Sequence, residues 1–376
     1  MIRRVCAAKL GEFASVVEPQ HAIQELIPIF RQFSQDDQDA CRVLCIESLI
    51  PLVRILSQEN NRIHTLGSVL NASEDKSWKV RLCLAKNFAQ FSKAFGREIT
   101  EGNLVQTWNV LLNDNEPEVK NAAISSLCKT LKANDMALEK IMNFFLPNIR
   151  DQIADSQVAF KISASTALCA MGATVGRQVC SNQIIPIILE LLKDDNHEVR
   201  LSTTQNMIKL AQVMGEQEFI SPTMKTTLTQ LTKDQQWRVR MAVFEFLGDF
   251  AKSFEGPQSV ENFKQLVEPI FMAYMTNTAA SVRMMGVAKA KELVKVAYMP
   301  HDWVADDFVN KCVESYNVDQ QGYNYRMCAI ESLAAVMPVL SKEEVTNKIV
   351  PTFKKALGDR IPNVQFCACR IIKANR

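Results

Sequence analysis

A basic residue that recurs about every forty positions constrains the fold of this chain more than any other feature. It follows an apolar residue and an acidic or polar turn, as in Asp75–Arg81 and Asp234–Arg240. We take this basic position as the anchor of a repeat. It is found at Arg3, Arg42, Arg81, Lys120, Lys161, Arg200, Arg240, Arg283, Arg326 and, with glutamine in place of the base, Gln365. The steps are 39 to 43 residues, so ten repeats fill the 376 residues and leave no room for a separate domain.

Three columns of residues around the anchor predict a helix. The residue before the anchor is apolar or aromatic in every repeat, and the seventh residue after it is apolar in every repeat. The third residue after it is mostly small, as in Ala123, Ala164 and Gly286. These three positions are successive i, i+4 neighbours on one helical face. Each anchor therefore lies at the start of a helix, here called helix B, that a polar turn precedes.

A proline column predicts a second helix, helix A, upstream of each turn. Proline stands fourteen residues before the anchor in five repeats, at Pro28, Pro147, Pro186, Pro269 and Pro351. Proline within a helix removes a hydrogen bond and bends the axis. A two-helix repeat of about forty residues is typical of HEAT repeats. We predict an all-α protein, an α-α superhelix in which residues 1–376 form a single HEAT-repeat solenoid of about ten units.

Composition narrows the class of protein. Lys and Arg number 43 against 41 Asp and Glu, a formal net charge of +2, which gives no sign of a nucleic-acid partner. No stretch approaches the ~20 uninterrupted apolar residues that span a bilayer, so no membrane partner is expected. The eleven cysteines are an odd number without an export signal, which favours free thiols in a reducing compartment. We expect an intracellular protein of the cytoplasm, with the nucleus as a second location.

The motifs of common catalytic and metal sites are missing from the sequence. It has no glycine-rich phosphate loop, no G-x-S-x-G, no H-E-x-x-H and no C-x-x-C, and its four histidines lie in different repeats. We predict no enzyme activity, no metal site and no cofactor. The cysteines are interpreted as core residues, with a redox or metal role as the alternative. Paired acids such as Asp36 and Asp37 are interpreted as helix caps.

The anchors themselves allow two interpretations. Basic residues at regular spacing could bind nucleic acid, or each could pair with turn carboxylates of its own or the next repeat. The regular occurrence in nearly every repeat favours the second, a ladder of ion pairs along the array. Binding sites are expected where the repeat departs from its own pattern.

Aromatic residues in the turn are such departures. Trp78 and Trp237 stand three residues before their anchors, each followed by a cation, and Tyr323 fills the same position in the ninth repeat. An aromatic beside a cation at a solvated turn is typical of an interface anchor. The alternative is that each tryptophan covers the end of a neighbouring helix. Trp108 and Trp303 lie within or near helix A and are predicted to be core residues.

At Asp75–Arg81 and Gln236–Ala242 the sequence closely resembles the scaffolding (A) subunit family of protein phosphatase 2A, and Lys9–Phe13, His197–Leu201 and Asn324–Met327 agree with it. The resemblance is expected to run through all ten repeats. It implies a non-catalytic scaffold that bridges a phosphatase catalytic subunit with a regulatory (B-type) subunit. Residues 1–136 would form the regulatory-subunit side and residues 219–376 the catalytic-subunit side.

The same resemblance implies the residues at each interface. On the regulatory-subunit side these are Arg3, Arg4, Trp78 and Lys79. On the catalytic-subunit side they are Trp237, Arg238, Tyr323, Asn324, Tyr325, Arg326 and Asn363. Family members carry further repeats at both ends, so the chain is expected to be a fragment, an incomplete gene model or a short paralogue. The alternative function is that of an importin-type HEAT transport receptor or another protein-binding HEAT adaptor.

Overall fold

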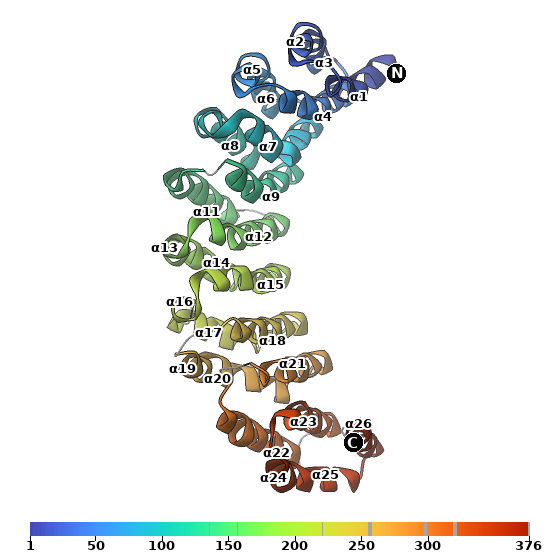
Figure 1. The fold of residues 1–376 in the computed structure, drawn as a ribbon, viewed down its shortest axis with the longest axis vertical. Helices are drawn as coiled ribbons and strands as arrows, with labels where there is room; N and C mark the ends of the chain where they lie inside the picture. Colours follow the sequence, from blue (N-terminus) through green and yellow to red (C-terminus); the bar gives the residue numbers. More distant parts are fainter. Residues whose placement is uncertain are drawn as a thin grey trace. The chain divides into compact units, whose positions relative to one another are not determined.

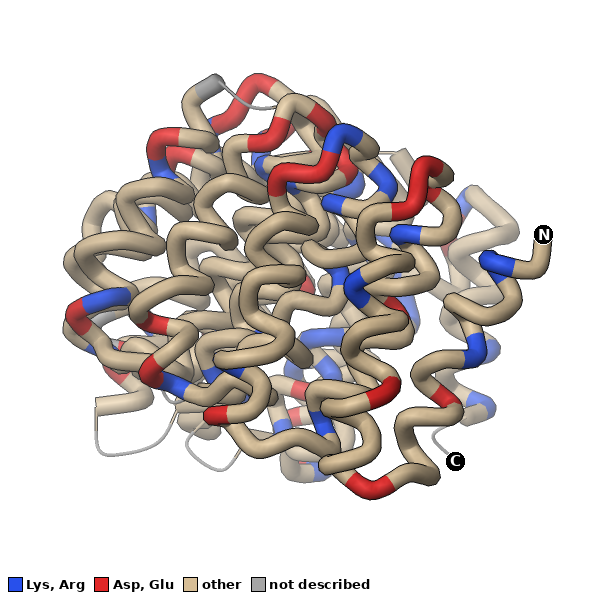
Figure 2. The backbone as a smooth tube through the Cα atoms, turned by 90° about the horizontal axis from the view of Figure 1, so that it is seen from above, with Lys and Arg blue, Asp and Glu red and all other residues tan. Residues whose placement is uncertain are grey.

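The computed structural model describes residues 1–134, 136–155, 157–219, 221–254, 258–296, 299–318 and 322–374. Within these residues the chain is helical and contains no β-strand, which confirms the all-α prediction (Figure 1). The chain divides into two compact units, Met1–Ile188 and Leu189–Arg376, here called the N-terminal half and the C-terminal half. Many acidic and basic positions gather at the turns that end the helices (Figure 2).

Helices B of the N-terminal half stack in sequence order, each against the next. They are α1 (Ile2–Ala14), α4 (Asp39–Ile55), α7 (Trp78–Ile99), α9 (Pro117–Asn134) and α12 (Val158–Val175). Shorter segments form the A helices of this half: α2 (Pro19–His21), η1 (Ala22–Leu26), α3 (Ile27–Ser34), α5 (Gln58–His64), α6 (Leu66–Ser73), η2 (Thr100–Leu104), α8 (Val105–Leu112), α10 (Leu138–Lys140), η3 (Ile141–Phe145), α11 (Leu146–Asp155), α13 (Arg177–Val179), η4 (Cys180–Ile184) and α14 (Ile185–Leu191).

The C-terminal half repeats this arrangement. Its B helices are α15 (His197–Met214), α18 (Trp237–Lys252), α21 (Ala280–Leu293), α23 (Tyr323–Val336) and α26 (Pro362–Ala374), and each packs on the next. The remaining segments are α16 (Glu216–Phe219), α17 (Pro222–Leu231), α19 (Ser259–Asn262), η5 (Phe263–Val267), α20 (Glu268–Phe271), η6 (Met272–Thr276), η7 (Trp303–Phe308), α22 (Val309–Asn317), η8 (Met337–Val339), α24 (Lys342–Glu344), η9 (Val345–Ile349) and α25 (Val350–Leu357). Every B helix after α1 begins three residues before its anchor, so the predicted register is confirmed.

The predicted columns form the core of each half. The residue before the anchor is buried from Cys41 to Val282, and the seventh residue after it is buried from Leu10 to Leu333. The clearest exceptions are at the first and last B helices, where Ile2 is 80% and Ile372 39% exposed. Among the described residues no further helix covers the outer face of α1 or α26, so the same pattern has nothing to pack against there.

The bend predicted at the proline column takes a specific form. Each of the five prolines stands in the second position after a π-helical turn, as Pro28 does after η1 and Pro351 after η9. Proline has no amide hydrogen to donate to the carbonyl four residues back, so the preceding turn relaxes to the wider spacing. Thr100–Leu104 adopts the same turn without a proline, so the bend belongs to the repeat and proline only favours it.

Helix α12 is apolar throughout, with a mean hydropathy of 1.4 over its 18 residues. By length and composition it is the one helix among the described residues that could cross a membrane. Half of it is buried inside the protein, and it packs against α9. Core helices of repeat proteins share this composition because neighbouring helices bury their faces, and α12 is buried in this way by α9 and by the A-helix segments α11 and η4.

Candidate protein interface

The anchors form a ladder of ion pairs that joins successive repeats. In the N-terminal half the Arg42 guanidinium donates two hydrogen bonds of 2.8 Å to the carboxylate of Asp75, 33 residues on. Arg81 makes the same pair with Asp114, at 2.5 and 2.9 Å. In the C-terminal half Arg200 pairs with Asp234 and Arg326 with Asp359, with distances between 2.7 and 3.0 Å. The prediction of a ladder is confirmed at these four anchors, whereas Lys120 Nζ donates to the neutral Gln152 Oε1 instead.

Each ladder residue also shapes its own turn. Arg81 Nη1 donates to the carbonyl of Asp75, 2.7 Å away, so one guanidinium binds the turn before it and the carboxylate of the next repeat. Asp75 Oδ1 accepts a hydrogen bond of 2.8 Å from the Ser77 amide. The turn acids therefore bind the amide of the N-cap residue, whereas the sequence led us to expect caps on amides within the helix. The aspartate stands two residues before the N-cap position, too early to reach those.

Burial makes the ladder pairs sensitive to protonation. The side chains of Arg42 and Asp75 are 6% and 13% exposed. Burial alone would raise the pKa of Asp75, but the hydrogen bonds from Arg42 and from the Ser77 amide outweigh it and hold the pKa below its usual value. Asp114 and Asp359 show the same lowered pKa for the same reasons. The ionised ladder is the stable form.

The ladder predicts acid destabilisation. A carboxyl whose folded pKa is lowered stabilises the fold fully above its unfolded pKa of about 3.9, and this contribution is lost as the pH falls through the folded value. We expect the free energy of unfolding, measured by urea titration, to be steady between about pH 7 and pH 5 and to fall steeply below about pH 4. For the variant Asp114→Asn, the free energy of unfolding should be lower at pH 7 and should decrease by less as the pH is lowered. A flat profile down to pH 3 would contradict this account.

Two successive anchors of the C-terminal half lack a carboxylate partner among the described residues. Arg240 Nε meets the neutral Asn277 Oδ1 at 3.2 Å. Arg283 is 7% exposed, and its Nη1 donates to the carbonyls of Asn277 and Thr278. Its guanidinium lies 4.9 Å from the centre of the Tyr325 ring, a cation–π contact that offsets part of the cost of burial. The turns here carry positive charge that the ladder does not neutralise.

The aromatic residues of the turn are solvent-exposed. Trp78, Trp237 and Tyr323 are the first residues of α7, α18 and α23 and are 37%, 39% and 37% exposed. The Arg238 guanidinium lies 5.7 Å from the Trp237 ring. Lys79 Nζ lies 3.7 Å from Asp39 Oδ2. The equivalent first position of α21 holds Ala280, so a large ring is not required there for folding.

The other residues assigned by the resemblance fall into two groups. Arg3, Arg4, Asn324 and Asn363 are exposed at or near helix starts, and Arg3 also pairs with Asp36 at 3.2 Å. The Arg326 side chain is 11% exposed and forms the ladder pair with Asp359, so it ties the first turn of α23 to the turn that precedes α26.

Some features of these turns were not predicted from the sequence. Arg240 and Arg283 belong to the regular anchor column. In the sequence they are marked only by the neutral residues Asn277 and Gln320, which stand six residues before the next anchor, where the other turns have aspartate. Gln365 keeps half of the anchor's role, because its Nε2 donates to the Asp359 carbonyl at 2.6 Å.

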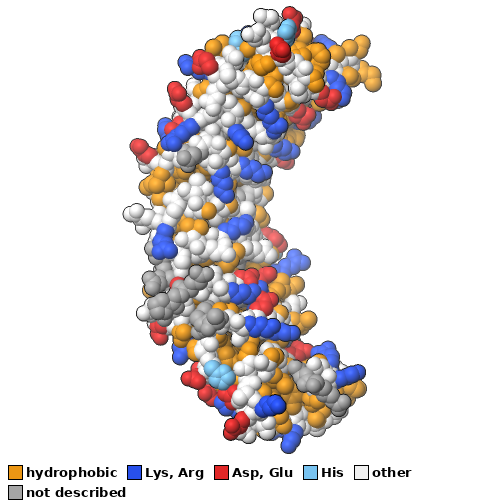
Figure 3. Space-filling view, in the orientation of Figure 1, with side chains coloured by type: hydrophobic (Ala, Val, Ile, Leu, Met, Phe, Trp, Pro, Cys, Tyr) orange, Lys and Arg blue, Asp and Glu red, His pale blue; other side chains and the backbone are white. Residues whose placement is uncertain are grey.

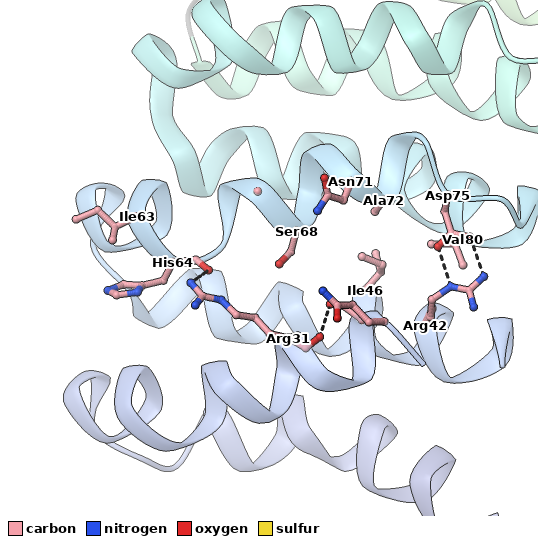
Figure 4. A pocket seen from close by; sticks show the side chains of 13 residues that line it. Arg31, Arg42, Ile46, Ile63, His64, Ser68, Asn71, Ala72, Asp75 and Val80 are labelled. Carbon is pink, nitrogen blue, oxygen red and sulfur yellow. Dashed lines mark hydrogen bonds and ion pairs between the residues drawn. The ribbon is translucent and has the colours of Figure 1, made fainter. Parts of the chain in front are cut away.

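A cleft of about 290 Å³ opens beside the first ladder pair of the N-terminal half (Figure 4). It lies between α3 and α6, with Arg42 and Asp75 at one end and Ile63 and His64 at the other. Arg31 crosses it and donates to the His64 carbonyl at 3.2 Å. The cleft is lined largely by polar side chains, and it is the space left between the neighbouring A helices α3 and α6.

The cysteines behave as core residues. Eight of the eleven are buried, and all are free thiols. Burial raises the pKa of Cys83 and Cys328 to about 12, so both stay protonated at neutral pH.

Trp108 and Trp303, at 0% and 1% exposure, are core residues as predicted. Among the described residues no cluster of three His, Cys, Asp or Glu side chains could hold a metal ion.

Comparison with known proteins agrees with this architecture. The HEAT repeat family model matches residues 184–214 and 226–254. The chain is 35% identical over 97 residues to the PP2A regulatory (A) subunit of Schizosaccharomyces pombe, and 29% identical over 123 residues to the beta isoform of the human 65 kDa regulatory (A) subunit of phosphatase 2A. These segments cover 26% and 32% of this chain and 16% and 20% of the relatives, less than the ten repeats over which the resemblance was expected.

Solved structures share the fold. Yeast importin-β and another importin-β structure superpose on 98% of the chain with TM-scores of 0.59 and 0.63, and the chain spans about half of each. At 14% and 11% identity this likeness concerns the fold alone. The chain thus contains HEAT repeats, matched at residues 184–214 and 226–254, and over part of its length its sequence is similar to the regulatory (A) subunits of protein phosphatase 2A.

Proposed function

We propose that this chain is a non-catalytic scaffold that bridges a phosphatase catalytic subunit with a regulatory (B-type) subunit in the cytoplasm and the nucleus. The observation that carries the proposal is the exposed tryptophan followed by a cation at the start of two B helices, α7 and α18. Trp237 with Arg238 is the clearest case. Such pairs are enriched among the residues that dominate binding energy at protein interfaces.

The ladder supports this role physically. A few exposed side chains bind a partner more tightly when they are already held in place, because less conformational entropy is lost on binding. The turn that carries Trp78 is held at Asp75, whose carboxylate pairs with Arg42 and whose carbonyl accepts a hydrogen bond from Arg81. The turn that carries Trp237 is held in the same way at Asp234, by Arg200 and Arg240. The buried ladder thus orders the turns, and the exposed residues vary from repeat to repeat to select partners.

Partners are assigned to the two ends of the chain by the sequence similarity to regulatory (A) subunits. We assign Arg3, Arg4, Trp78 and Lys79, within residues 1–136, to the regulatory subunit. We assign Trp237, Arg238, Tyr323, Asn324, Tyr325, Arg326 and Asn363, within residues 219–376, to the catalytic subunit. Among the described residues no ladder carboxylate compensates the charges of Arg240 and Arg283, which favours an acidic surface on the catalytic subunit that would bind there.

Co-purification tests the proposal. The variant Trp237→Ala with Arg238→Glu is expected to lose capture of a phosphatase catalytic subunit by at least about tenfold, because it removes the aromatic anchor and reverses the adjacent charge. The alanine reproduces the residue found in the first position of α21, so the fold should survive, which circular dichroism can check. Unchanged capture by a folded variant would overturn the assigned interface.

The matched control lies in the other half. Trp78→Ala with Lys79→Glu makes the same chemical change at the start of α7. It should weaken capture of the regulatory subunit but leave capture of the catalytic subunit unchanged. If both variants lose both partners equally, the division of the chain into two sides is wrong.

A further inference from the structure

The B helices of the N-terminal half carry a group of cations that neither the ladder nor the turns use. Arg54 lies on α4, Lys86 and Lys93 on α7, and Lys129 on α9, and all four are exposed. Among the described residues none of them has a carboxylate within ion-pair distance. Figure 3 shows Lys and Arg side chains gathered on the surface over α7 and α9, with few acidic side chains among them. This surface has a positive potential that is not neutralised within the half.

A groove runs between these cations. Two adjoining cavities of about 620 and 460 Å³ share Ala89 and Lys129 in their walls. Small side chains line it along its length: Ala89, Ala94, Ala122, Ser125 and Ala133. A narrow groove with small side chains between basic ones admits an extended main chain, whereas bulky residues at these positions would close it. We call it the B-helix groove.

One buried polar atom in this groove is unsatisfied. Asn121 lines the second cavity, and its Oδ1 is buried without a hydrogen-bond partner. A buried acceptor without a partner costs about 1–3 kcal/mol, and a rotation of the Asn121 side chain that brings Oδ1 to the groove wall would let a donor from outside satisfy it. A peptide N–H is such a donor. At the other cavity Arg54 Nη2 donates to Gln90 Oε1, which holds the guanidinium at the groove wall.

We propose that the B-helix groove binds an extended acidic segment of a partner protein. Carboxylates of the segment would pair with Arg54, Lys93 and Lys129, and a backbone amide would donate to Asn121. Single-stranded nucleic acid fits less well, because the groove has no aromatic side chain on which bases could stack. The groove lies on the helix bodies and is separate from the turn residues of the proposed scaffold interface.

Fluorescence anisotropy tests this proposal. The probe is a labelled peptide of alternating Glu and Ser, about twelve residues long, which would bind in an extended conformation. We expect binding at low salt that a peptide of Gln and Ser does not show. Lys93→Glu with Lys129→Glu should weaken it by at least about tenfold, since two attractions become repulsions. The same two charge reversals at exposed lysines outside the groove, Lys76→Glu with Lys140→Glu, should weaken it by less than about threefold.

Two further arms separate the groove from general charge attraction. Asn121→Ala leaves the net charge unchanged and should weaken peptide binding by about threefold if the amide contact is made. Equal affinity of the groove variant and the unaltered protein would overturn the proposal. So would tighter binding of a labelled single-stranded oligonucleotide than of the acidic peptide. Because Lys93 and Lys129 lie outside the turns, the groove variant should still capture the phosphatase catalytic subunit, which distinguishes failure here from failure of the scaffold proposal.

Discussion

Replacing Asp75 with alanine is expected to lower the free energy of unfolding of the N-terminal half by about 3–5 kcal/mol. The change leaves the guanidinium of Arg42, which is 6% exposed, without its counter-ion, and removes the acceptor of the Ser77 amide. An uncompensated buried charge and an unsatisfied turn amide both oppose folding. Urea denaturation followed by circular dichroism measures the loss. Hydrogen exchange should show the largest increase in α4, α6 and the turn between α6 and α7.

Two comparisons make this prediction specific. Glu74→Ala removes the neighbouring acid, which is exposed, and should change stability by less than about 0.5 kcal/mol. The double variant Asp75→Ala with Arg42→Met removes both charges and should recover a large part of the loss, because no buried charge is left unpaired. If the losses of stability caused by Asp75→Ala alone and by Arg42→Met alone simply add in the double variant, the two side chains are not energetically coupled, and the ladder would be a by-product of packing.

The second large effect is expected at Gly286. A Cβ built there would lie 2.0 Å from Cγ of Tyr274, far inside van der Waals contact. Tyr274 is fully buried, and its hydroxyl is bonded to Ser332 Oγ at 2.7 Å, so the ring cannot move aside without breaking the contact with α23. Gly286→Ala should therefore lower the free energy of unfolding of the C-terminal half by about 3 kcal/mol. Thermal and urea denaturation measure it.

Gly67→Ala is the matched control because it makes the same substitution in helix α6, where a Cβ would meet nothing within 4 Å. It should raise stability by up to about 1 kcal/mol through helix propensity alone. Tyr274→Phe keeps the ring and removes the hydroxyl, and should cost about 1–2 kcal/mol. A stabilising Gly286→Ala would mean that α21 and η6 can separate without cost, contrary to the packing described.

The sequence predicted the repeat well because the repeat is local. The three columns around each anchor are spaced by four residues along one helix, and a helix brings such positions together whatever surrounds it. The start of every B helix after α1 and the burial of columns such as Val80 and Val239 follow from this. The columns fail at Ile2 and Ile372, where burial depends on a neighbouring helix that the described residues do not supply.

The site was predicted only where a departure shows within one turn. Trp78, Trp237 and Tyr323 stand out against Ala280 at the same position, and their exposure agrees with an interface role. The missing carboxylates beside Arg240 and Arg283 were not predicted, because the partner of each anchor lies in the next repeat. That partner is identified only once the direction of the ladder is known.

The amino-acid sequence alone therefore determined the period, the two-helix repeat, the buried columns and the exposed aromatic turns. The columns and turns depend on residues within about eight positions of one another along a helix, and the period follows because this local pattern recurs every 39 to 43 residues. The tertiary structure decided which carboxylate each anchor binds, 33 or 34 residues away. It also decided that Arg54, Lys93 and Lys129, on three different helices, line one groove. Stacking of repeats brings these side chains together, and the distance between stacked helices is set by packing that no local pattern encodes.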